Sequence, residues 1–155
     1  MMILAAAAFP AVASAQEKDV YPDFGTLARH EKEGTDFHVA VKNRASRTCV
    51  LAIHGGRIEE GTAELAARVA GDDWSYYILS GAKPARNRVL HVTSAHFDDP
   101  RAVALVRSAK QCVSIHGFKE PDADIACVGG ANAGFRDRRA QGRAQERRRA
   151  ERREG

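Results

Sequence analysis

The strongest constraint on the fold is a series of apolar runs that alternate with segments of helical periodicity. Residues 49–54, CVLAIH, form a continuous apolar run that ends at two glycines, which is typical of a buried central strand. Residues 37–42, FHVAVK, alternate apolar and polar side chains and predict a strand with one open face. By similar reasoning we expect further strands at residues 74–79, 89–94, 112–117 and 124–130.

Helical patterns separate these predicted strands. Thr62 is expected to cap a helix over residues 63–70, which a glycine closes. Asp99 and Pro100 form a cap followed by a first-turn proline, which predicts a second, amphipathic helix. A short helix or a loop is expected in residues 24–37. The alternation of strands and helices predicts an α/β fold, a three-layer sandwich with a mostly parallel or mixed sheet.

The first 15 residues have the pattern of a signal peptide. An alanine-rich apolar run ends at Ala13, Ser14 and Ala15, a small-x-small sequence typical of a cleavage site. The run is shorter than the ~20 apolar residues that a membrane-spanning helix needs. We therefore expect an exported protein, periplasmic or extracellular, without a membrane span. The alternative is a disordered or loosely helical N-terminus of a cytosolic protein.

Positive charge is concentrated at the C-terminal end of the chain. The net charge is +4, but residues 131–155 hold nine arginines and four acidic residues, so residues 1–130 carry −1. Because this Arg-rich tail has no apolar periodicity, we expect it to be disordered, a lone exposed helix or a frameshifted reading. Nucleic-acid binding is disfavoured, since no aromatic interleaving or nucleic-acid module accompanies the arginines.

Three cysteines, Cys49, Cys112 and Cys127, show neither a C-x-x-C pair nor zinc-finger spacing. All three lie in or beside predicted strands, where a free cysteine behaves as a small hydrophobic residue. We therefore expect them in the core. In an exported protein, one disulfide with one thiol left over is the alternative.

Histidines follow two of the predicted strands at the point where each strand ends. His54 and His116 both stand between an apolar run and a glycine, and they reach the same sheet edge if their strands are neighbours. Glu59 follows His54 by five residues across a glycine pair, close enough to return to the same point. Two imidazoles and one carboxylate are the protein ligands of hydrolytic zinc enzymes. The alternatives are structural histidines at strand ends and a solvated acidic turn.

Other polar residues near these strands are candidates for supporting roles. His91 is expected either to be buried against backbone or to orient a metal ligand, and His96 to lie in the cleft or outside the site. Arg101 flanks the motif strands and is a candidate for binding a carboxylate-rich substrate. Ordinary solvated surface is the alternative for this arginine, as it is for Lys83, Arg86 and Arg88.

Several segments together resemble the poly-γ-glutamate hydrolase family, zinc-dependent enzymes whose fold is similar to that of zinc carboxypeptidases. The matching segments are AIHGGRIEEGTAELAARVAG, SYYILSGAK, LHVTSAHFDDP and VSIHG followed by CVGG, in the family's order. The upstream YPDFGTLARHEKEGTDFHV also resembles the family's N-terminal segment. The resemblance runs from Tyr21 to Gly130 and implies a zinc hydrolase-like domain over residues 21–130.

This resemblance implies a ligand set and a reaction. By their match to the family's HGGxIE and SIHG segments, His54, Glu59 and His116 are implied to bind Zn2+. The implied reaction is hydrolysis of γ-glutamyl amide bonds in a polyanionic glutamyl polymer or peptide. In it a zinc-bound water attacks the carbonyl, and a glutamate acts as general base.

The sequence departs from the family pattern at its C-terminal end. The family's catalytic glutamate lies on a later strand in a segment similar to Q-L-E, which nothing here matches. Glu146, Glu151 and Glu154 lie among arginines without an apolar strand to place them. We therefore expect a C-terminally incomplete domain. Without the catalytic glutamate, such a domain would lose its activity. The alternative function is a non-catalytic metal- or polyanion-binding protein.

Overall fold

Four strands form one mixed sheet in the computed structural model, which describes residues 18–118, 127 and 129–131. The chain divides into two compact units, residues 1–118 and 119–155, and every helix and strand described lies in the first. The strand order is β1-β3-β2-β4. The strands are β1 (Phe37–Lys42), β2 (Thr48–Gly56), β3 (Ser75–Gly81) and β4 (Gln111–Ser114).

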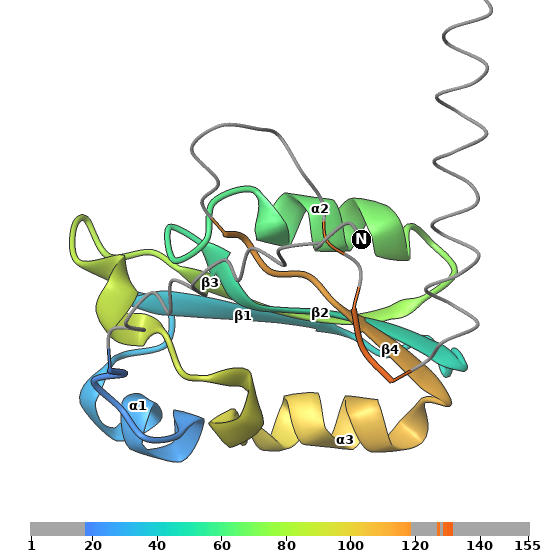
Figure 1. Ribbon diagram of the computed structural model, residues 1–155, viewed down its shortest axis with the longest axis horizontal. Coiled ribbons are helices and arrows are strands. Elements are labelled where there is room, and N and C mark those ends of the chain that lie inside the picture. Colours follow the sequence, from blue (N-terminus) through green and yellow to red (C-terminus); the bar gives the residue numbers. More distant parts are fainter. Residues whose placement is uncertain (1–17, 119–126, 128, 132–155) are drawn as a thin grey trace, which may run out of the picture. The chain divides into compact units, whose positions relative to one another are not determined.

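The sheet combines parallel and antiparallel pairs. β2 is parallel to both β3 and β4, whereas β1 is antiparallel to β3. Helix α2 (Thr62–Ala70) covers one face, and α1 (Phe24–His30) and α3 (Pro100–Ser108) cover the other (Figure 1). The predicted α/β sandwich with a mixed sheet is therefore confirmed.

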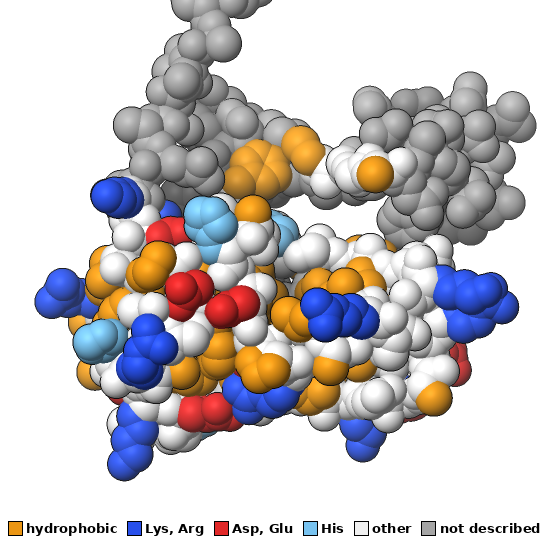
Figure 2. All heavy atoms as spheres, turned by 90° about the horizontal axis from the view of Figure 1, so that it is seen from below, with side chains coloured by type: hydrophobic (Ala, Val, Ile, Leu, Met, Phe, Trp, Pro, Cys, Tyr) orange, Lys and Arg blue, Asp and Glu red, His pale blue; other side chains and the backbone are white. Residues whose placement is uncertain are grey.

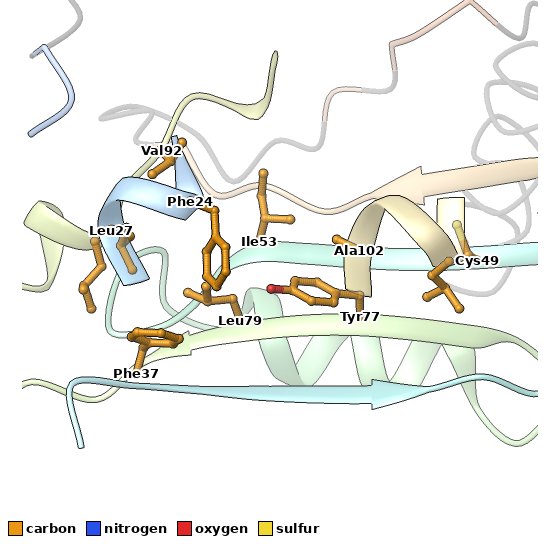
Figure 3. Close-up of a cluster of buried hydrophobic side chains, with 11 residues drawn as sticks. Phe24, Leu27, Phe37, Cys49, Ile53, Tyr77, Leu79, Val92 and Ala102 are labelled. Carbon is orange, nitrogen blue, oxygen red and sulfur yellow. The ribbon is translucent and has the colours of Figure 1, made fainter. Parts of the chain in front are cut away.

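Two apolar clusters hold the layers together. The cluster between the sheet and α1 and α3 contains Phe24, Phe37 and Tyr77, and Figure 3 shows these rings between the strands and the helices. The cluster on the α2 side is built from small and branched side chains: Val50, Ala52, Ala66, Ala70 and Ile78. Because β2 contributes to both clusters, its continuous apolar sequence is explained by burial on both faces.

The segment predicted as a strand at residues 89–94 is not one. It contains the ends of two 3-10 helices, η1 (Asn87–Leu90) and η2 (Ser94–His96). Leu90 and Val92 are fully buried, which explains the alternating pattern. The backbone between the helices binds side chains instead of a strand: Val92 O accepts from the His54 ring, and Thr93 N donates to Asp19.

Helix boundaries also differ slightly from expectation. Gly61, in the left-handed region at φ 84°, is the N-cap of α2. Thr62 is the first helical residue, and its hydroxyl donates to Glu59 O at 2.7 Å instead of accepting from the helix. The predicted Asp99 cap is confirmed, since its carboxylate accepts from Arg101 N. The predicted strand at residues 124–130 lies largely outside the described residues, as do the leader and almost all of the Arg-rich tail.

The expectation of three core cysteines is wrong for two of them. Cys49 and Cys112 are register partners on β2 and β4, and their sulfurs form a disulfide. Cys49 is fully buried, but Cys112 is exposed. Cys127 is an exposed free thiol. Cys112 is exposed because β4 pairs with β2 alone among the described strands and is open to solvent on its other side.

The surface of the described unit has mixed charge. On the side of α1 and α3, basic side chains stand apart from one another among acidic and apolar ones (Figure 2). No continuous basic surface is therefore present on this side of the described residues. Among the helices of this part of the chain, none has the length and apolar character needed to cross a membrane.

A buried polar network joins β3 to α3. The Tyr77 hydroxyl donates to Asp99 Oδ2 at 2.6 Å, and both side chains are fully buried. Arg101 donates to the same carboxylate and also to Glu33. Burial raises the pKa of Asp99, but its hydrogen bonds with Arg101 and Tyr77 outweigh this and hold the pKa below the ordinary value.

We expect Asp99→Ala to lower the free energy of unfolding by about 3 kcal/mol, because it leaves the Tyr77 hydroxyl and Arg101 without their partner. Tyr77→Phe should lower the free energy of unfolding by less, about 1–2 kcal/mol, because Arg101 still pairs with Asp99. Since the pKa is depressed in the folded state, the stabilisation by Asp99 is present above its unfolded value and declines as pH falls. Urea titrations between neutral pH and pH 3 measure both effects. A pH dependence unchanged in Asp99→Ala would contradict this assignment.

Candidate metal centre

A bulge at the end of β2 determines where His54 points. The pairing with β3 shifts between Ala52 and Gly55, so that β2 holds one more residue than β3 across this interval. His54 lies inside the bulge and is almost fully buried. The bulge therefore turns the His54 ring to the carboxyl end of the sheet.

The two glycines after His54 are required by close backbone contacts. A Cβ on Gly55 would lie 2.7 Å from Leu79 O, which leaves no space for a side chain. Gly56 has φ 63°, and a Cβ there would lie 2.6 Å from Gly81 O. The glycine pair therefore lets the loop leave β2 while it remains packed against β3.

Backbone bonds return the loop to the strand end. Glu59 N donates to His54 O at 2.8 Å, which closes a turn between the two residues. Thr62 at the start of α2 donates to Glu59 O and fixes the other side of the turn. The five-residue spacing in the sequence therefore brings the Glu59 carboxylate back beside the His54 ring.

His116 reaches the same point from the neighbouring strand. β4 is parallel to β2, and Ile115 N extends the ladder by donating to Leu51 O at 2.8 Å. Gly117 N donates to Glu59 Oε2 at 2.8 Å, so the segment after β4 is attached to the loop after β2. The expectation that His54 and His116 share one sheet edge is confirmed.

Polar side-chain atoms of three residues, His54, Glu59 and His116, converge at this edge. His54 Nδ1 lies 3.0 Å from Glu59 Oε1 and 3.2 Å from His116 Nδ1. His116 Nδ1 lies 3.5 Å from Glu59 Oε2. The two imidazole rings meet at 63°, so their in-plane lone pairs can be directed to a common point.

The other ring nitrogens are held by protein atoms. His54 Nε2 lies 2.9 Å from Val92 O, a carbonyl that can accept its N–H, and this leaves Nδ1 on the side of Glu59 and His116. His116 Nε2 lies 2.9 Å from Ser114 Oγ, a hydroxyl that can accept its N–H. Backbone or hydroxyl partners of this kind orient metal-binding histidines.

The electrostatics of this group fit a cation. Burial raises the pKa of Glu59, but hydrogen bonds with His116, His54 and the Gly117 amide outweigh it, and the pKa lies below the ordinary value. Glu59 is therefore a carboxylate at neutral pH. At these distances either a proton on a histidine nitrogen or a metal ion must lie between the carboxylate and the two Nδ1 atoms. Histidine nitrogens and a carboxylate oxygen suit zinc.

His91 lies beside this group in a different orientation. Ligand atoms of His54, Glu59 and His91 also come within 4.8 Å of one another. The His91 ring stacks on His54 with centroids 4.0 Å apart and planes 23° apart. Lone pairs in two stacked planes do not point to one ion between the rings. His91 Nε2 is also 4.0 Å from Glu59 Oε1, farther than His116 Nδ1 is from Glu59 Oε2.

Asp19 also helps to hold His91 beside this group, which the sequence did not predict. Its carboxylate accepts from His91 Nδ1 at 2.6 Å and from Thr93 N at 2.5 Å. The hydrogen bond with Asp19 raises the pKa of His91, but burial lowers it more, so the pKa lies below the ordinary value. Asp19 precedes the first predicted element by several residues, so no periodicity or motif in the sequence marks it.

The remaining predicted site residues lie apart from this group. His96 is exposed at the end of η2, and no described contact joins it to His54, Glu59 or His116. Arg101 belongs to the network with Asp99 and Glu33. Lys83 pairs with Glu31. Contact with substrate by His96 or Arg101 stays a prediction.

Comparisons with known proteins agree with this architecture. Residues 21–142 match the family described as poly-gamma-glutamate hydrolase. The UPF0714 proteins YndL and YmaC of Bacillus subtilis (strain 168) are 42% and 33% identical over 124 and 117 residues. These alignments cover 80% and 75% of this chain and 48% of each relative, so the chain spans about half the length of the curated relatives it matches.

Two solved structures also match. Zinc-free, apo YndL superposes with a TM-score of 0.64 at 43% identity, over 68% of this chain and 51% of that one. A bacteriophage poly-gamma-glutamate hydrolase superposes with a TM-score of 0.65 at 37% identity, over 68% and 52%. Sequence and structure therefore point to the same relatives. The chain belongs to the poly-gamma-glutamate hydrolase family.

Proposed function

We propose that this chain carries the metal centre of a zinc-dependent hydrolase that cleaves γ-glutamyl amide bonds in poly-γ-glutamate or a related glutamyl peptide. His54, Glu59 and His116 are the proposed ligands. The observation that carries the proposal is the convergence of His54 Nδ1, His116 Nδ1 and the Glu59 carboxylate within 3.5 Å. Family membership supports the glutamyl substrate.

His54 and Glu59 have different tasks in the proposed centre. The Val92 carbonyl holds His54 in the tautomer that leaves Nδ1 free to bind. Glu59 supplies negative charge, and the Gly117 amide fixes its second oxygen. When bound, zinc would lower the pKa of a water ligand and polarise the carbonyl of the bond to be cut.

The proposal is tested by zinc content and by hydrolysis. We expect the purified chain to retain one zinc after dialysis and Glu59→Gln to bind zinc at least about tenfold more weakly, because the amide carries no charge. Glu60→Gln is the matched control, since Glu60 is an exposed neighbour with no described contact to the centre. A parent chain without zinc affinity would contradict the proposal.

Hydrolysis separates an enzyme from a binding protein. We expect the zinc-loaded chain to release glutamyl oligomers from poly-γ-glutamate, and a chelator to stop the release. Zinc uptake without release would instead support a non-catalytic metal- or polyanion-binding protein. That alternative is favoured by one observation: among the described residues, no carboxylate other than Glu59 contacts His54 or His116.

We also propose that the protein is exported. The alanine-rich leader with its small-x-small sequence supports this, and so does the Cys49–Cys112 disulfide, because disulfides persist in oxidising compartments. Fractionation of cells that express the chain, with detection of the cleaved form outside the cytoplasm, tests the proposal.

A further inference from the structure

Asp19 lies outside the proposed ligand set, yet it bonds to both neighbours of the residue whose carbonyl contacts His54. One carboxylate oxygen accepts from His91 Nδ1 at 2.6 Å, and the other accepts from Thr93 N at 2.5 Å. These partners are 72 and 74 residues away along the chain, and Val92 lies between them. A single side chain therefore holds both ends of the segment formed by residues 91–93.

This segment carries the carbonyl that faces the His54 ring. Val92 is fully buried, and its oxygen lies 2.9 Å from His54 Nε2. The His54 ring is itself almost fully buried, so its nitrogens need protein partners. Val92 O is the described partner of Nε2, whereas Nδ1 lies beside Glu59 and His116. The position of one carbonyl therefore decides which ring nitrogen faces the proposed metal.

Secondary structure does not fix residues 91–93. They lie between η1 and η2 and belong to no helix or strand. The two ends of the segment bond to the adjacent 3-10 helices, but Val92 forms no backbone–backbone hydrogen bond among the described residues. The Asp19 carboxylate therefore supplies the hydrogen bonds that a neighbouring strand supplies elsewhere in the fold.

Asp19 also holds the ring that covers His54. The His91 ring stacks on His54 with centroids 4.0 Å apart, and its Nδ1 donates to Asp19. Burial raises the pKa of Asp19, but its hydrogen bonds with Thr93 and His91 outweigh this and hold the pKa below the ordinary value. Both oxygens are therefore acceptors at neutral pH. One carboxylate thus restrains the edge of the His54 ring through Val92 and its face through His91.

We propose that Asp19 is a positioning residue of the metal centre. It holds residues 91–93 so that His54 Nε2 faces Val92 O and Nδ1 faces the metal. The inference rests on the proposed function and adds a residue to it. If Asp19 only attached the N-terminal segment to the fold, its loss would lower stability and leave the His54 ring unchanged.

The test variant is Asp19→Asn, which keeps the shape of the side chain but leaves one oxygen acceptor where there were two. NMR of the ring nitrogens in the metal-free full chain, above neutral pH, reports which nitrogen of His54 carries the proton. We expect the proton on Nε2 in the parent and a mixture of both forms in the variant. Zinc affinity, measured by chelator competition, should fall about tenfold, the lower end of the range for partners of metal ligands.

Asp98→Asn is the matched control. Asp98 Oδ1 accepts from Gly25 N at 3.0 Å across 73 residues, so this variant removes the same charge from a carboxylate with a similar long-range contact. It should leave the His54 signals unchanged and zinc affinity within about twofold. In a His54→Ala background, Asp19→Asn should change the residual zinc affinity by less than about twofold, because the ring through which Asp19 acts is absent.

Unchanged His54 signals in Asp19→Asn, or equal losses of zinc affinity in Asp19→Asn and Asp98→Asn, would overturn the positioning role. A loss that persists in full in the His54→Ala background would also overturn it, because charge attraction alone would then explain the loss.

The positioning role and the proposed function fail in distinguishable ways. If zinc binds equally well to the parent and to Asp19→Asn, the positioning role is wrong and the proposed function stands. If the parent binds no zinc, the proposed function is wrong, and the NMR comparison of the metal-free chains still decides whether Asp19 orients His54.

Discussion

His116→Ala is expected to weaken zinc binding by more than about a hundredfold. Apart from substitutions of His54 and Glu59, no other single change should reduce zinc affinity as much. Loss of an orienting partner alone reduces metal affinity about 10–100-fold, so loss of a ligand atom should exceed that range. His116 Nδ1 is 3.2 Å from His54 Nδ1 and 3.5 Å from Glu59 Oε2, which places it within the proposed ligand set. Competition with a chromogenic zinc chelator measures the change.

His91→Ala is the control that distinguishes the two possible third ligands. Because His91 stacks on His54 and is bound by Asp19, we regard it as a residue that packs and orients the His54 ring. Its removal should weaken zinc binding less than His116→Ala does. A larger loss in His91→Ala than in His116→Ala would contradict this ligand set and favour His54, Glu59 and His91. Melting curves of the metal-free variants show whether either substitution acts through unfolding.

Reduction of the Cys49–Cys112 disulfide is expected to lower the free energy of unfolding by about 4 kcal/mol. The disulfide closes a loop with a sequence separation of 63, and long closed loops restrict the unfolded chain most. It also joins β4, a strand of four residues, to the centre of the sheet. Urea unfolding of the metal-free chain with and without a thiol reductant measures the effect.

The same bond should affect the metal centre, because β4 leads directly to His116. Cys112→Ala removes the bond at an exposed position and therefore leaves no cavity. We expect it to match the reduced parent in stability and to bind zinc more weakly than the oxidised parent. Cys127→Ser is the matched control, since Cys127 is a free, exposed thiol and its change should alter neither quantity. A zinc affinity equal in oxidised and reduced chains would show that β4 holds His116 without the disulfide.

The elements that periodicity identifies well are those buried on defined faces. The runs at residues 49–54 and 74–79 became β2 and β3 because their apolar side chains face the two clusters. In the run at residues 37–42, which became β1, Phe37 and Val39 pack against the cluster on the side of α1 and α3, and the other face is exposed. Residues 89–94 show the same alternation, yet they form no strand. Their apolar side chains are buried, but the backbone groups bind the His54 ring and Asp19, and a hydrophobic pattern cannot distinguish these partners from a neighbouring strand.

For the proposed metal centre, the sequence by itself identified His54, Glu59 and His116 as candidates, because both histidines stand between an apolar run and a glycine and Glu59 follows His54 by five residues. Only the tertiary structure decided that these atoms meet, since that depends on β2 and β4 being parallel neighbours and on the bulge at His54. It also placed Asp19 and His91 beside them and Arg101 elsewhere. The reason is physical: local patterns report which face of an element is buried, whereas a site is built from contacts between residues far apart in the chain.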